Sequence, residues 1–87
     1  MANEALYAEA VLGRDAEEFL SSDMGRYLIG RAQLEAQEAM EQLKKVSTWR
    51  RRRIQELQNK IWRAESIEAW LVELVSSGKA AEAALED

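Results

Sequence analysis

The sequence predicts an all-α fold, with an antiparallel hairpin of two long helices at its centre and short N-terminal and C-terminal helices packed around it. The 87 residues include no proline and only four glycines, the two residues that fit least well inside a helix. Alanine, glutamate, leucine, arginine and glutamine are abundant, and all are good helix formers. Apolar residues also recur at steps of three and four along two long stretches, which is the period of a helix face.

A chain of this length is expected to form one domain over residues 1–87. Its core should be thin, because small domains bury a smaller share of their surface. Short helices are expected in residues 1–22, a long helix in 23–46, a second long helix in 48–77, and a short helix or frayed tail in 79–87.

The N-terminal part carries the signals of two short helices. Residues 4–12 form the first, and Gly13 is placed to end it, because glycine accepts the left-handed conformation found after many helices. Residues 16–20 form the second. Ser22 or Asp23 can then cap the next helix, because a short side chain with an oxygen atom accepts a backbone N–H there.

Two long amphipathic helices are expected to follow. The apolar face of the first consists of Leu28, Ala32, Ala36, Ala39, Leu43 and Val46. The second is expected to begin at a cap formed by Ser47 or Thr48 and to end at Gly78. Its apolar face consists of Ile54, Leu57, Ile61, Ala64, Ile67, Leu71 and Leu74. A short break between two such helices predicts an antiparallel pair.

The charge pattern favours the same pairing. Residues 44–63 carry eight basic residues and one acid, whereas the segments on both sides are acidic and bring the net charge of the chain to −4. With the turn near residue 48, the helix register brings opposite charges together across the pair. The expected ion pairs are Arg31 with Glu65, Glu35 with Arg63, and Glu38 with Lys60.

Each long helix also carries apolar side chains outside its main face, and a helix with two apolar sides needs two partners. Trp62 and Trp70 lie on the opposite side of the second long helix, and Tyr27 and Leu34 lie off the main face of the first. Under one interpretation the terminal segments cover these faces with Leu6, Tyr7, Val11, Leu12, Phe19, Leu20 and Leu85. Under the other, a face binds a different protein or a second copy in a homodimer, because tryptophan, tyrosine and arginine dominate binding hot spots.

Cations around the expected turn form a candidate anion-binding cap, which consists of Lys44, Lys45, Arg50, Arg51, Arg52 and Arg53. Consecutive arginines splay around a helix and form no single basic face. Arg51 and Arg52 point away from the helix pair and are candidates for the charged rim of an interface. The cap has three interpretations: it binds nucleic acid, for instance in DNA packaging, it binds an acidic protein, or its charges pair internally. The pI of about 4.9 is unusual for a nucleic-acid binder.

No residue pattern predicts catalysis. The chain has no histidine and no cysteine, which removes the commonest general base and the commonest transition-metal ligands. No G-x-S-x-G or P-loop motif occurs. We therefore expect no enzyme activity, no metal and no cofactor. The sequence shows neither a basic leader nor an apolar run long enough for a membrane, and the lack of cysteine fits a reducing cytoplasm.

Two segments, GRYLIGRAQLEAQEAMEQL and IQELQNKIWRAESIEAWLVELVSSGKAA, contain a GRY-L-x-GRA helix start, an LQN-x-IWRAE…WL helix and a closing G-x-x-A. Over about residues 24–84 the chain thereby resembles small uncharacterised helical proteins of tailed bacteriophages and prophages. The link STWRRRR departs from the acidic or proline-containing link expected of those proteins. The resemblance implies a phage or prophage setting. With the surplus apolar faces, we expect an accessory protein that acts by protein–protein interaction, in a structural, assembly or host-directed role.

Overall fold

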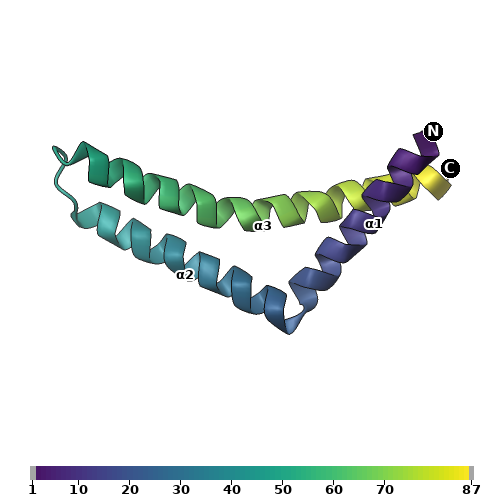
Figure 1. The fold of residues 1–87 in the computed structure, drawn as a ribbon, viewed down its shortest axis with the longest axis horizontal. Helices are drawn as coiled ribbons and strands as arrows, with labels where there is room; N and C mark the ends of the chain where they lie inside the picture. The colour runs from purple at the N-terminus through teal and green to yellow at the C-terminus, as the bar shows by residue number, and fades with distance from the viewer. Residues whose placement is uncertain (1, 87) are drawn as a thin grey trace. The chain divides into compact units, whose positions relative to one another are not determined.

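The part of the chain that the structure describes is almost entirely helical. The computed structural model describes residues 2–86, which form α1 (Ala2–Ser21), α2 (Asp23–Lys45) and α3 (Arg51–Glu86) (Figure 1). The prediction of an all-α fold is therefore confirmed.

The predicted combination of two long helices with short ones is not confirmed. α1 is 20 residues long, α2 is 23 and α3 is 36. The predicted helix ends at Gly13 and Gly78 are wrong, because both glycines lie inside helices. Residues 79–86 continue α3 instead of forming a separate helix or a frayed tail. The predicted ranges also included residues 1 and 87, which lie outside the described residues.

The described residues form two compact units. Unit 1 holds residues 2–26 and 69–86, and unit 2 holds residues 27–68. Both are built around small side chains. The buried apolar residues of unit 1 are Ala10, Ala16 and Ala81, and those of unit 2 are Ala36, Ala39, Leu57 and Ala64. Leu57 in unit 2 is thus the one large side chain in this set, and it is only 2% exposed.

In unit 1, two glycines allow α1 and α3 to approach closely. A Cβ atom added to Gly13 would lie 2.7 Å from the Cα atom of Gly78 and 2.8 Å from the carbonyl oxygen of Leu74. Neither glycine has a positive φ, so each supplies space and not a special backbone conformation. A glycine inside a helix costs about 1 kcal/mol relative to alanine. The close helix contact offsets this cost, which is why these glycines do not end their helices.

Ser22 separates α1 from α2 and caps the second helix. Its Oγ accepts a hydrogen bond from the Gly25 N–H at 3.0 Å and donates one to the Phe19 carbonyl oxygen at 2.7 Å. The prediction of a cap at this position is confirmed for Ser22. Arg26 completes the junction, because its Nε and Nη2 atoms donate to the carbonyl oxygen of Ser21 at 3.2 and 2.8 Å. This carbonyl lies at the end of α1, where helical partners are missing.

Unit 2 pairs the later part of α2 with the first half of α3, and the two segments run antiparallel (Figure 1). Two side-chain hydrogen bonds join them. Gln33 Nε2 donates to Glu68 Oε2 at 2.8 Å, and Arg53 Nη2 donates to Gln42 Oε1 at 2.7 Å. These two bonds are nine residues apart on α2 and fifteen apart on α3, and the reach of the long side chains accounts for the difference, because both helices rise by the same distance per residue.

The predicted ion pairs between these segments are wrong. None of the three forms among the residues that the structure describes. Arg31 instead lies 4.0 Å from Glu35, one turn away on the same helix. Facing positions alone do not bring such pairs together, because holding two long exposed side chains in one geometry costs conformational entropy.

The connection between α2 and α3 is a turn whose Ser47 carbonyl oxygen accepts the Arg50 N–H at 3.0 Å. The Arg50 carbonyl oxygen then accepts the Ile54 N–H at 3.1 Å, which places the start of α3 at Arg51. The predicted cap at Ser47 or Thr48 is therefore wrong, because both residues lie too early in the chain to reach the free N–H groups of α3. Arginines occupy the first turn of α3, and no acidic residue does.

Candidate binding surfaces

The two tryptophans predicted as interface anchors are both exposed. Trp62 in unit 2 is 64% exposed, and Trp70 in unit 1 is 58% exposed. Trp62 lines a shallow hollow on α3 together with Glu56, Asn59 and Arg63. Its indole therefore has polar neighbours and little apolar support within this hollow.

Tyr27 and Leu34, the predicted candidates on α2, are also exposed. Both lie in unit 2. On the same helix, Ile29 is half-buried and Ala36 is buried. These two residues therefore mark the inward face of α2. Tyr27 and Leu34 consequently remain available on the outer side of the segment.

The terminal segments supply only part of the predicted cover. Leu6, Phe19, Leu20 and Leu85 are half-buried, whereas Tyr7, Val11 and Leu12 are exposed. The buried positions of α1 are Ala10, Gly13 and Ala16, so its larger side chains cannot all face inward. The terminal segments therefore leave Trp70 and part of their own apolar surface uncovered within unit 1.

An open groove in unit 1 was missed at the sequence level. It is lined by Tyr7, Ala10, Val11, Arg14, Glu82, Leu85 and Glu86. Arg14 Nε donates to Glu82 Oε1 at 2.7 Å across its edge. This hydrogen bond, helped by the attraction between the two charges, raises the pKa of the Arg14 guanidinium above its ordinary value. The groove thus has apolar walls and a charged rim, the usual composition of a protein-binding surface.

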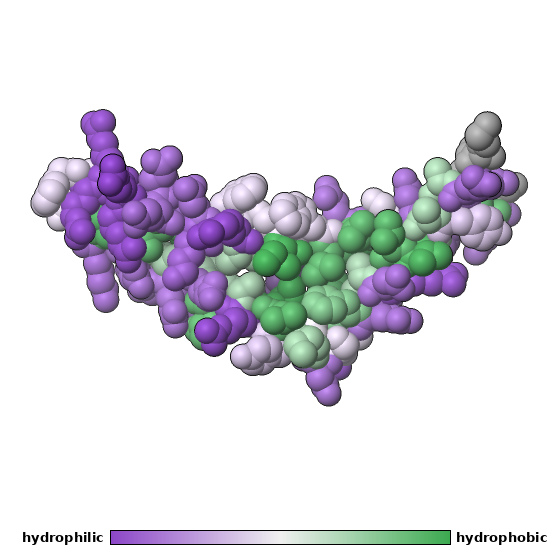
Figure 2. Space-filling model, viewed as in Figure 1, coloured by the Kyte–Doolittle hydropathy of each residue, from purple (hydrophilic) through white to green (hydrophobic). Residues whose placement is uncertain are grey.

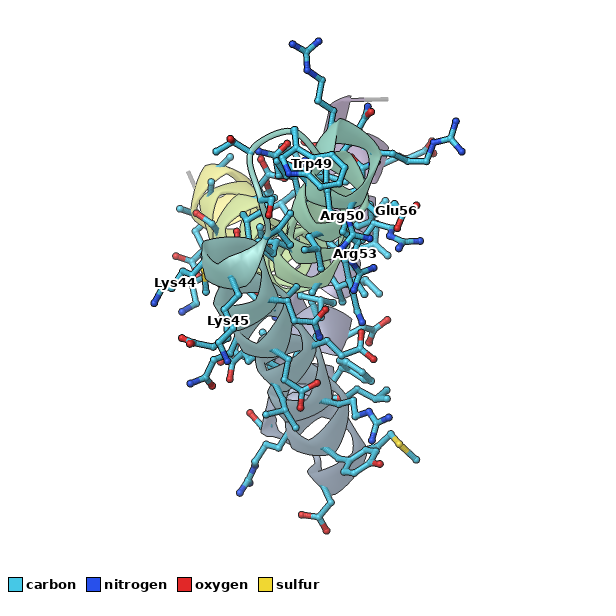
Figure 3. All side chains as sticks on the ribbon, turned by 90° about the vertical axis from the view of Figure 1, so that its left-hand side faces the viewer. Lys44, Lys45, Trp49, Arg50, Arg53 and Glu56 are labelled. Carbon is cyan, nitrogen blue, oxygen red and sulfur yellow. The ribbon has the colours of Figure 1, made fainter. Side chains whose placement is uncertain are left out.

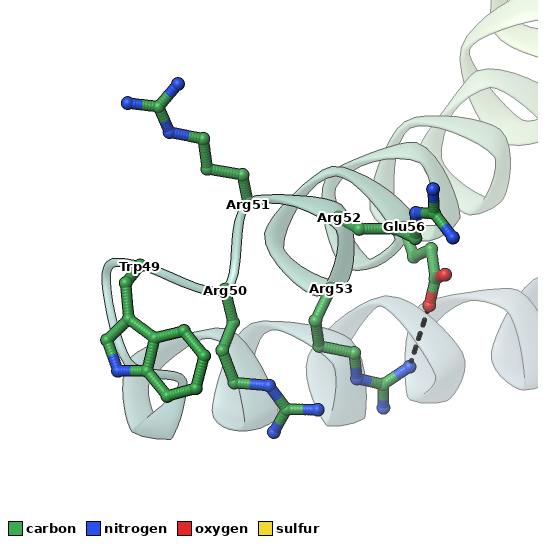
Figure 4. Close-up of a pocket in the computed structure, with 6 residues that line it drawn as sticks. All are labelled: Trp49, Arg50, Arg51, Arg52, Arg53 and Glu56. Carbon is green, nitrogen blue, oxygen red and sulfur yellow. Dashed lines mark hydrogen bonds and ion pairs between the residues drawn. The ribbon is translucent and has the colours of Figure 1, made fainter.

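The predicted cationic cap is only partly brought together. Trp49 and Arg50–Arg53 line one open pocket at the turn, with Glu56 (Figure 4). Lys44 and Lys45, at the end of α2, lie on the other side of unit 2 from Arg50 and Arg53 (Figure 3). On the face shown in Figure 2, the end of unit 2 that holds the turn is strongly hydrophilic.

The arginines differ in direction and in bonding. Arg50 and Arg53 lie side by side, whereas Arg51 points away from both (Figure 4). Arg53 is held by Glu56, 3.4 Å from its Nη1, as well as by Gln42. Within residues 2–86, Arg50, Arg51 and Arg52 form no ion pair. Internal pairing therefore neutralises only one of the four arginines.

Trp49 was not among the predicted site residues, although it directly precedes the arginine run. It is 79% exposed, and its indole lies beside the Arg50 side chain (Figure 4). The sequence signal that could have identified it is a tryptophan outside the helical periodicity, next to a cluster of cations.

No group of three or more histidine, cysteine or carboxylate side chains in residues 2–86 is arranged to hold a metal ion. Over the same residues, no helix combines the length and the apolar character needed to cross a membrane.

Comparison with known proteins gives no relative. No protein-family model, curated protein or solved structure matches this chain. The resemblance to helical proteins of phages and prophages therefore stays a prediction.

Proposed function

We propose that this chain is a non-enzymatic helical protein that acts by binding other proteins, including a second copy of itself, through exposed aromatic side chains on α3. The exposure of Trp62 and Trp70 carries this proposal. Burying a large aromatic side chain removes some 150–250 Å² of surface from water and dominates the energy of many interfaces.

The thin cores support the same function. Apart from Leu57, each unit buries only alanines among its apolar residues, while larger side chains stay at the surface. Tyr7 and Val11 in unit 1 and Leu34 in unit 2 are examples. Apolar area that a chain does not bury on folding is available to a partner.

The setting that we propose is a bacteriophage or prophage, with the protein in the cytoplasm of the bacterial host and in a structural, assembly or host-directed role. The GRYLIGRA and LQNKIWRAE segments support this setting.

Light scattering after size exclusion tests self-association over micromolar to millimolar concentrations. We expect the wild-type mass to rise with concentration towards a dimer. The double variant Trp62→Ala with Trp70→Ala should remain a monomer. Trp49→Ala is the matched control, because it removes an even more exposed tryptophan from the turn and should leave the mass unchanged.

A second measurement covers other partners. The wild-type chain, the double variant and the control are each immobilised and exposed to a nuclease-treated bacterial lysate, and captured proteins are quantified by mass spectrometry. Partners should be retained by the wild type and Trp49→Ala and lost by the double variant. The proposal fails if the wild type is a monomer throughout and the three baits capture the same proteins.

A further inference from the structure

The turn between α2 and α3 combines an aromatic ring with four arginines, of which only Arg53 has an internal ion pair within residues 2–86. The exposed Trp49 indole and the side chains of Arg50 and Arg53 form a row on one side of the turn (Figure 4). Arg51 and Arg52 add positive charge close by. We propose that this row binds single-stranded nucleic acid, with Trp49 stacking on a base and Arg50 and Arg53 contacting phosphates of neighbouring nucleotides.

The bonding of the arginines supports the proposal. Arg53 is held in place by Gln42 and Glu56, so little conformational freedom is lost when it binds a phosphate. Its guanidinium has five N–H donors, and those two contacts leave some free. Arg50 has no ion pair within the described chain and lies beside the tryptophan. The row thus offers two guanidinium groups to phosphate. That of Arg53 is already held in position, and that of Arg50 has no ion pair in the described part of the chain.

The position of the arginines in the helix points the same way. Arg51–Arg53 occupy the first turn of α3, where the helix dipole disfavours positive charge. Lys44 and Lys45, in contrast, occupy the last turn of α2, where the dipole favours it. The arginine run therefore does not serve the stability of α3, and an anionic ligand provides the compensating charge.

The aromatic ring favours nucleic acid over an acidic peptide. Carboxylates need only the cations, whereas a base stacks on an exposed indole flanked by arginine, as in sequence-tolerant single-strand binders. The row is short, which suits a single strand better than the extended groove of a duplex. The net charge of −4 does not prevent this, because salt screens charges beyond about 8 Å at physiological ionic strength. The carboxylate that lines the pocket, Glu56, already pairs with Arg53.

Fluorescence anisotropy with a labelled oligothymidylate of about twelve nucleotides tests the proposal on the full chain. We expect binding at low salt, weakened roughly tenfold by Trp49→Ala, because stacking on one base is worth about that much. Arg50→Gln should reduce the slope of log affinity against log salt by about 0.7, the loss of one phosphate contact on a single strand. Arg51→Gln is the matched control, since it removes the same charge from a side chain that points away.

Three results would overturn the proposal. One is no binding to the oligonucleotide at low salt. Another is an equal loss in Arg50→Gln and Arg51→Gln with no effect of Trp49→Ala, which would indicate binding by charge alone. The third is tighter binding of a poly-glutamate peptide than of the oligonucleotide, which would assign the turn to an acidic protein. Circular dichroism should show the same helix content in all variants, because Trp49, Arg50 and Arg51 are exposed. Trp62→Ala should bind the oligonucleotide normally, so this test and the test of self-association fail independently.

Discussion

At the scale of single residues, the glycines of this chain occupy opposite environments inside helices. Gly13 lies in α1 against the backbone of Gly78, with no room for a Cβ atom. Gly30 lies in α2 with nothing within 4 Å of the position that a Cβ atom would take. The same substitution at the two positions therefore separates helix propensity from helix packing.

We predict that Gly30→Ala raises the free energy of unfolding by about 0.5–1 kcal/mol, because alanine is the better helix former. Gly13→Ala gains the same propensity but forces α1 away from α3, and overpacking of this kind costs about 1–3 kcal/mol. We therefore expect Gly13→Ala to lower the free energy of unfolding by about 1 kcal/mol. Urea denaturation followed by circular dichroism measures both. A higher urea midpoint for Gly13→Ala would contradict the close helix contact.

At the scale of helices, the N-termini of α2 and α3 differ in how they are capped. Ser22 satisfies a free N–H at the start of α2 with its side chain. Ser47 contributes only its backbone carbonyl, to a turn that precedes α3. In the sequence, Ser22 (or Asp23) and Ser47 (or Thr48) were equally good candidates for caps.

We predict that Ser22→Ala lowers the free energy of unfolding by about 1 kcal/mol, because the Gly25 N–H loses its acceptor. Ser47→Ala should change it by less than about 0.5 kcal/mol, as expected of a surface position without a special role. The two urea midpoints give the comparison directly. If Ser47→Ala lowered the free energy of unfolding as much as Ser22→Ala, Ser47 would cap α3 in solution.

In the first turn of α3, by contrast with Ser22→Ala, we predict substitutions that raise the free energy of unfolding. Replacing Arg51 or Arg52 by glutamine removes positive charge from the positive end of the helix dipole. We therefore expect each substitution to stabilise the protein by a few tenths of a kcal/mol at low salt, and less at high salt. Thermal unfolding in low and high salt measures the effect. A loss of stability would show that these arginines make contacts that hold the fold together.

The sequence was sufficient for helix content and insufficient for helix ends. The absence of proline and the periodic apolar residues predicted helices correctly, because both act locally. Gly13 and Gly78 were misread as helix ends because their role depends on each other, across more than sixty residues of chain. At the site, Trp62 and Trp70 could be recognised from the helix period alone. The side-by-side position of Trp49 and Arg50 depends on the turn, which no periodicity describes.

At the scale of the whole molecule, two compact units share helices. α2 contributes Asp23–Arg26 to unit 1 and its remaining residues to unit 2, and α3 contributes to both as well. Each unit holds about half of the 87 residues. A core of three or four buried apolar side chains, mostly of alanine, is too small to stabilise a fold of that size alone. The prediction of a single domain is therefore a prediction that the two units unfold together.

Native-state hydrogen exchange measured by NMR tests this prediction. Leu57→Val trims the largest buried side chain of unit 2 and should cost about 1 kcal/mol. If the chain is one domain, the slowest amides of unit 1, near Ala10 and Ala16, should lose the same free energy as those around Leu57, because exchange in both units then requires global unfolding. Ile67→Val is the control, since the Ile67 side chain is 47% exposed and its trimming should alter neither unit. A loss confined to unit 2 would show that the units open separately. In that case, the nucleic-acid site proposed in unit 2 and the groove in unit 1 would belong to independently stable parts of the chain.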